Sequence, residues 1–98
     1  VLSAAELADE GMGPMPLPSS YEKLLKSDIA DIRNISRTRY GGSLTAGLFL
    51  QNFVADDMKW VHLDIAGPAF AERPIGTYIQ KGGTGFGVRT LAYFLKSL

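Results

Sequence analysis

One histidine and one aspartate, His62 and Asp64, are the residues whose types and spacing most directly suggest chemistry. They alternate with apolar neighbours, so on a strand both side chains would point to the same face. Such a pair could bind a metal ion, or act as a base with its orienting carboxylate. A metal site needs three or more ligands, and no third His, Cys or Glu is close in sequence. The interpretation we favour is therefore a structural pair that satisfies nearby polar groups.

A glycine-rich segment, GTGFG at 83–87, precedes a predicted helix and invites comparison with phosphate-binding loops. Free N–H groups at the start of a helix attract anions. The segment lacks the Gly-Lys-Ser/Thr ending of a P-loop and does not directly follow a strand. We interpret it as a tight turn that packs the last helix.

Three arginines, Arg33, Arg37 and Arg39, cluster near Tyr40 and could form a nucleic-acid patch. The whole chain, however, has 10 Lys and Arg against 10 Asp and Glu, so its formal net charge is zero. That balance gives no reason to expect a nucleic acid or an acidic membrane as partner. Pairing of these arginines with acids or another subunit is the favoured alternative. Nucleic-acid binding would predict salt-sensitive retention on DNA.

The composition limits the class of protein. Ninety-eight residues allow one domain at most, and the chain has no cysteine. A disulfide framework and a thiolate metal site are therefore excluded, which fits a reducing, cytoplasmic environment. No apolar run approaches the length of a membrane span, and no signal peptide is recognisable. The chain starts at Val1, without Met and within a helical pattern, so we expect a piece of a longer protein.

The elements that would position these residues form an α/β pattern centred on a strand. Trp60–Ile65 is rich in aromatic and β-branched residues, and Gly67-Pro68 ends it abruptly, as in a buried strand. The carboxyl ends of strands are where open α/β sheets usually bind ligands. Capping boxes and apolar periodicity predict helices around it, and the segment between Pro68 and Gly85 is predicted as loop. The expected helices are Ser3–Glu10 with Gly11 as its C′ residue, Ser19–Lys26, Ser43–Val54 buried on most sides, and amphipathic Val88–Leu98.

Five segments, in this order and spacing, resemble the leucyl aminopeptidase (cytosol aminopeptidase) family. The similarity covers most of the chain from about Pro14 and is strongest around the predicted strand. The segments are MPLP at 15–18, LKSDIADIRN at 25–34, GGSLTAGLFL at 41–50, WVHLDIAGPA at 60–69 and KGGTGFGVRTL at 81–91.

This resemblance implies that residues 1–98 are the C-terminal segment of a three-layer α/β aminopeptidase catalytic domain, here mainly helices around one or two strands. Enzymes of the family release N-terminal residues, preferably leucine, from peptide substrates. They use two divalent metal ions, typically zinc, with manganese or magnesium as alternatives. The resemblance further implies a cytoplasmic homohexamer.

The departures from the family pattern determine what this chain can do alone. The signature Asn-Thr-Asp-Ala-Glu-Gly-Arg, which carries metal-bridging carboxylates, is absent, and His62 and Asp64 do not match family metal ligands. The tryptophan that usually precedes the MPLP segment is also missing. What does map is one wall of the substrate side-chain pocket, at Ala66 and Ala69, where small residues leave room for a Leu- or Met-sized group. We therefore expect no metal site and no turnover from the chain alone.

Two further expectations follow. A chain with the family's fold but without its chemistry could instead be a binding or regulatory module. A partial domain would also expose apolar surface and an open sheet edge, which predicts self-association in solution.

Overall fold

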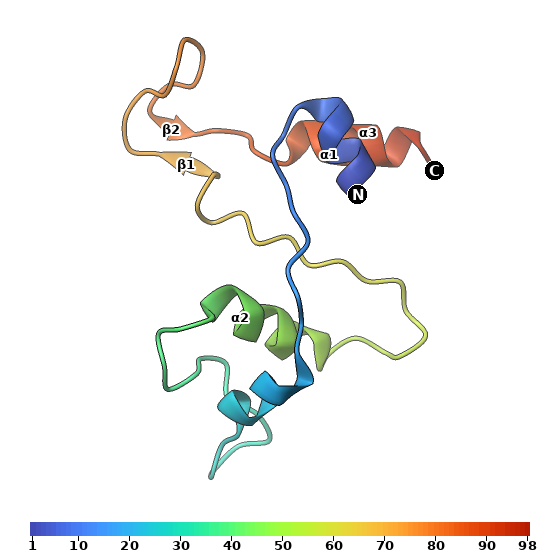
Figure 1. The fold of residues 1–98 in the computed structure, drawn as a ribbon, viewed down its shortest axis with the longest axis vertical. Helices are drawn as coiled ribbons and strands as arrows, with labels where there is room; N and C mark the ends of the chain where they lie inside the picture. The colour runs from blue at the N-terminus through green and yellow to red at the C-terminus, as the bar shows by residue number, and fades with distance from the viewer. The chain divides into compact units, whose positions relative to one another are not determined.

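A computed structural model describes all of residues 1–98, which divide into two compact units (Figure 1). The first unit contains Val1–Pro14 and Asp64–Leu98, and the second contains Met15–Leu63. Helices predominate and one small sheet is present, which confirms the predicted mainly helical α/β arrangement. In chain order the elements are α1 (Leu2–Ala8), the 3₁₀-helix η1 (Ser19–Leu25), α2 (Gly42–Gln51), β1 (Phe70–Ala71), β2 (Gly82–Gly83) and α3 (Val88–Lys96).

In the first unit, α1 packs against α3 (Figure 1). The buried face of α1 consists of three alanines, Ala4, Ala5 and Ala8, whose small side chains allow a close approach. The helix ends at Asp9, which is left-handed with φ 53°, so the prediction of Gly11 as the residue that ends it is wrong. Asp and Asn tolerate this conformation better than most residues with a side chain.

Neither predicted capping box forms. The N-cap of α1 is Val1 and that of η1 is Pro18, and no side chain caps either helix. α1 begins at Leu2, before Ser3, and η1 begins at Ser19 itself. Neither serine therefore occupies the N-cap position from which its hydroxyl could cap the helix. The hydroxyl–carboxylate spacing was therefore present in the sequence without the backbone geometry that it requires.

A short antiparallel pair, β1 with β2, lies where the sequence predicts only loop. Phe70 pairs with Gly83 and Ala71 with Gly82. An isolated bridge between Ile75 and Ile79 lies within the connection. Two glycines have no side-chain pattern from which a strand could be predicted. The loop prediction is wrong for these residues, and the pairing fixes both ends of the 70–83 segment.

In the second unit, α2 packs against η1 around the buried side chains of Leu25 and Leu48. Gly47 lies at the closest approach. A Cβ added there would be 2.8 Å from Cδ2 of Leu17 and 3.6 Å from Cδ2 of His62. The absence of a side chain at Gly47 therefore leaves room for two neighbouring side chains.

The prediction that the helix expected at Ser43–Val54 is buried on most sides is wrong. Within α2 only Thr45, Gly47 and Leu48 are buried. Leu50 is 41% exposed, and Phe53, just beyond the helix, is 69% exposed. The apolar circumference was predicted correctly, but this chain supplies neighbours for one side of the helix only.

The predicted central strand at Trp60–Ile65 is also absent, because a strand requires a hydrogen-bonded neighbour. The β1–β2 pair is the one sheet of the structure and does not include these residues. Val61, which was expected on a buried face, is 59% exposed. The residues have strand-forming composition but no partner strand within this chain.

The last helix, α3, follows its predicted position closely, but its apolar face is largely uncovered. Val88, Leu91 and Leu95 are 65%, 46% and 65% exposed. Thr90 is its one buried residue. No helix here combines the length and apolar character that crossing a membrane would require.

Candidate functional site

The candidate pocket-wall residues, Ala66 and Ala69, lie on one turn that begins directly after Ile65. The amide of Ala69 donates a hydrogen bond of 2.9 Å to the carbonyl of Ile65, which closes the turn. Ala66 is exposed and Ala69 half-buried. The turn thus presents two methyl groups with little bulk, which is what a wall that accommodates an apolar side chain requires.

Thr84 connects this turn to the segment before α3. Its hydroxyl donates to the carbonyl of Pro68 at 2.5 Å, and its amide donates to the carbonyl of Ala69 at 2.9 Å. The same hydroxyl accepts a hydrogen bond from the amide of Phe86 at 3.2 Å. One residue therefore holds two consecutive carbonyls of the turn, and the β1–β2 pairing begins at the next residue, Phe70.

His62 lies against Trp60 and Gly47. The rings of Trp60 and His62 are stacked, with centroids 6.3 Å apart and planes at 15°. Nε2 of His62 is buried and has no hydrogen-bond partner. No three His, Cys, Asp or Glu side chains of the chain are grouped so that they could bind a metal ion. The His62 ring packs against its neighbours, and the prediction that His62 satisfies nearby polar groups is wrong for Nε2.

Glu10 is a polar residue that sequence reasoning missed, and it forms the densest hydrogen-bonded cluster of the first unit. It is only 7% exposed. Its Oε1 accepts from the amide of Gly87 at 3.2 Å, and its Oε2 accepts from the amide and hydroxyl of Thr90 at 3.0 and 2.6 Å. Nε of Arg89 lies 3.5 Å from Oε1. A carboxylate 77 residues upstream therefore caps the start of α3.

This cap decides between the two interpretations of the 83–87 segment. A phosphate would need the free N–H groups at the start of α3. The amides of Gly87 and Thr90 already donate to Glu10. The chain's own carboxylate therefore occupies the position of the anion, and the interpretation as a packing turn holds.

These contacts also alter the pKa of Glu10. The hydrogen bond from the Thr90 hydroxyl is the largest cause and lowers the pKa; burial opposes it. The amides of Thr90 and Gly87 and the charge of Arg89 lower it further, and the net pKa lies below the ordinary value of 4.5. A carboxyl group with a depressed folded pKa contributes stability that is present above its unfolded pKa and is lost as the pH falls through the folded one.

We therefore expect the stability difference between the native chain and Glu10→Gln to depend on pH in one direction. The difference in the opening free energy of α3, measured by amide hydrogen exchange, should be constant from pH 8 to 6. It should then shrink as the pH falls below about 4.5, because the protonated carboxyl resembles the amide. A difference that is unchanged at pH 3 would show that Glu10 does not titrate in this range.

The arginine cluster forms one exposed ion pair. Nη2 of Arg37 lies 3.4 Å from Oδ2 of Asp28, and the two side chains are 73% and 91% exposed. Exposed pairs of this kind contribute roughly 0–1 kcal/mol. Pairing with an acid is thus confirmed for Arg37, while Arg39 is exposed and Arg33 half-buried.

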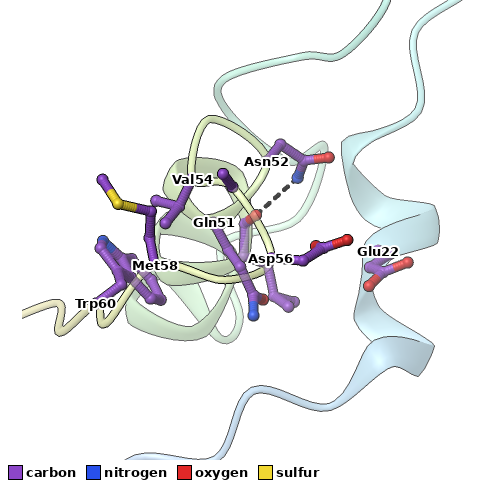
Figure 2. Close-up of a pocket in the computed structure, with 9 residues that line it drawn as sticks. Glu22, Gln51, Asn52, Val54, Asp56, Met58 and Trp60 are labelled. Atoms are coloured by element: carbon purple, nitrogen blue, oxygen red, sulfur yellow. Dashed lines mark hydrogen bonds between the residues drawn. The ribbon is translucent and has the colours of Figure 1, made fainter.

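A cavity of about 570 Å³ lies in the second unit, and it does not include the candidate pocket wall. Figure 2 shows Met58 and Trp60 on one side and the carboxylates of Glu22 and Asp56 on the other. Nδ2 of Asn52, which also lines it, donates to the carbonyl of Leu48 at 2.8 Å. The charged residues that line it, Glu22 and Asp56, are both acidic and both exposed, so no buried charged group is available there to bind a ligand.

The hydrogen bonds of Thr84 could have been partly foreseen from the sequence. A threonine whose hydroxyl accepts from the amide two residues on is a recognised turn motif, and glycines flank this one. Glu10 gave no comparable signal, because its partners lie 77 and 80 residues away in sequence.

Comparison with known proteins gives consistent matches. A profile described as "Cytosol aminopeptidase family, catalytic domain" matches residues 1–92. Proteins named "Probable cytosol aminopeptidase" from Prochlorococcus marinus (strain MIT 9313) and Streptomyces avermitilis are 50% and 53% identical over 95 and 91 residues. These alignments cover 97% and 93% of this chain but only 19% and 18% of the relatives. The chain therefore spans about a fifth of the length of the curated relatives that it matches.

Solved structures agree. The bottromycin maturation enzyme BotP in complex with Mn is 43% identical, with a TM-score of 0.91 over 98% of this chain and 21% of that one. A mutant of tomato leucine aminopeptidase is 36% identical, with a TM-score of 0.85 over 99% of this chain and 18% of that one. Since the profile match spans almost the whole chain and the backbone agrees with solved members, the chain belongs to the cytosol aminopeptidase family and covers the C-terminal part of its catalytic domain.

Proposed function

We propose that residues 1–98 form the C-terminal segment of the catalytic domain of a metallo-aminopeptidase and supply one wall of its substrate pocket. The observation that carries this proposal is the Ala66–Ala69 turn. Its two small side chains are accessible, and its carbonyls are held by Thr84. A fixed backbone with methyl groups is suited to define the shape of a pocket without taking part in bond making.

The substrate of the whole enzyme is a peptide whose N-terminal side chain lies against this wall, with leucine preferred. Small wall residues leave room for a branched aliphatic or a methionine side chain. Discrimination by such a wall rests on shape, and each methylene that fits or fails to fit changes transition-state binding by about 1–3 kcal/mol. The wall also keeps water from the apolar side chain.

Two divalent ions, zinc or manganese, would supply the Lewis acid and the hydroxide in the whole enzyme. The family resemblance supports this proposal, as does the name of the BotP structure, which is a complex with Mn. The residues of this chain do not fit such a site, because no cluster of three suitable ligands exists among them. The metal ligands would come from other polypeptide.

The test is a hybrid enzyme, defined as the Streptomyces coelicolor relative with its matching segment replaced by this chain. That relative is 53% identical over 91 residues. We expect the hybrid to hydrolyse a leucine p-nitroanilide in the presence of Mn²⁺, and the chain alone to show no metal-dependent turnover. An inactive or unfolded hybrid would contradict the proposed role, and turnover by the chain alone would contradict the absence of metal ligands.

The competing function is a binding or regulatory module that retains the fold. The exposed apolar face of α3 is compatible with it, since a face of this kind requires a partner. Peptide binding by the chain alone, with an inactive hybrid, would favour this alternative. A cytoplasmic location and a homohexameric assembly of the whole enzyme remain proposals that rest on the family resemblance.

A further inference from the structure

We infer that Thr84 is a positioning residue for substrate specificity, which deepens the proposed function and depends on it. Thr84 does not itself form the wall. It holds the turn that carries Ala66 and Ala69 through two donated hydrogen bonds, from its hydroxyl to Pro68 and from its amide to Ala69. The position of the two methyl groups therefore depends on a residue 15 positions further along the chain than Ala69.

The hydroxyl of Thr84 is the part of this arrangement that can be removed selectively. It donates to the carbonyl of Pro68 at 2.5 Å and accepts from the amide of Phe86 at 3.2 Å. The amide of Thr84 would keep its bond to Ala69 after any side-chain substitution except proline. Removing the hydroxyl alone should thus loosen the turn without deleting the β1–β2 pairing beside it.

A loosened wall has a specific kinetic consequence. Contact with the substrate's side chain is made equally in the ground state and in the transition state, so losing it raises KM and leaves kcat nearly unchanged. A small N-terminal side chain makes little contact with the wall and should be affected least. A general loss of stability would instead reduce the amount of active enzyme for all substrates alike.

The experiment uses the hybrid enzyme with leucine and alanine p-nitroanilides. We expect Thr84→Val to raise KM for the leucine substrate about 3- to 10-fold, with kcat within about 2-fold and with the alanine substrate nearly unaffected. Thr84→Ser keeps the hydroxyl and should restore the leucine preference. The matched control is Thr77→Val, because Thr77 is exposed and its hydroxyl has no hydrogen-bond partner.

Unchanged kinetics in Thr84→Val, or an equal loss for both substrates, would overturn the inference. Hydrogen exchange on the unsubstituted hybrid gives a second measurement, which needs no variant. The amides of Ala69 and Thr84 should exchange at least tenfold more slowly than that of Thr77, and equal rates would also overturn it. Ala69→Phe separates this inference from the function beneath it. If Ala69→Phe leaves leucine hydrolysis unchanged, the pocket wall itself is wrongly assigned. If Ala69→Phe impairs leucine hydrolysis and Thr84→Val does not, the pocket wall stands and the role of Thr84 is wrong.

Discussion

Replacing Glu10 by alanine should increase the hydrogen-exchange rates of the α3 amides about 30-fold. The substitution removes the acceptor for the amides of Gly87 and Thr90 and for the Thr90 hydroxyl. Buried donors left without a partner cost about 1–3 kcal/mol each, less where water can enter. Since the Arg89 side chain beside this cluster is about half exposed and water can enter there, we expect a net loss of about 2 kcal/mol in the opening free energy of α3.

The matched control is Glu6→Ala, which removes the same side chain at an exposed position within α1, four residues before Glu10. That variant should change the opening free energy by less than about 0.5 kcal/mol. Glu10→Gln should fall between the two, because its amide oxygen can still accept while the charge beside Arg89 is gone. If Glu10→Ala and Glu6→Ala exchange alike, the carboxylate does not hold the start of α3.

The second large effect is expected at the pocket wall. In the hybrid enzyme, Ala69→Phe should lower kcat/KM for the leucine substrate about 30-fold or more, because the ring fills the space into which the leucyl side chain must fit. Alanine p-nitroanilide needs less of that space and should lose less. Steady-state kinetics with both substrates measure the ratio directly.

A control with the same chemical change separates exclusion of the substrate from general damage. Ala30 lies in an exposed segment next to Ile29, which is 99% exposed, so Ala30→Phe adds an equal bulk away from the turn. Its leucine-to-alanine ratio should match that of the unsubstituted hybrid. An Ala69→Phe enzyme that retains the same ratio would remove Ala69 from the pocket.

The sequence correctly predicted the elements that are determined by residues close together along the chain. The apolar spacing located α2 and α3 to within a few residues, because a period of 3.6 residues is written in consecutive side chains. It failed where an element depends on a partner. Trp60–Ile65 has strand-forming residues but no partner strand in this chain. The Gly82–Gly83 strand has a partner strand but no strand-forming residues.

The site shows the same division. Ala66 and Ala69 could be named only through the family resemblance, since two alanines carry no chemical signal of their own. Thr84 had a local signal in its glycine-flanked turn, but that signal does not specify which carbonyls it contacts. The Glu10 cluster required knowledge that α1 lies beside α3, which no local pattern supplies.

The distance along the chain between Glu10 and the helix whose amides it accepts from, α3, has a consequence during biosynthesis. At about 5–20 residues per second, a ribosome needs on the order of 4–15 s to travel the 77 residues that separate Glu10 from Gly87. Throughout that interval Glu10 lacks its partners in α3, and Ala4, Ala5 and Ala8 lack the helix against which they pack. Assembly of the first unit is therefore late and non-local, and the apolar face of α1 stays accessible to chaperones until α3 has been made.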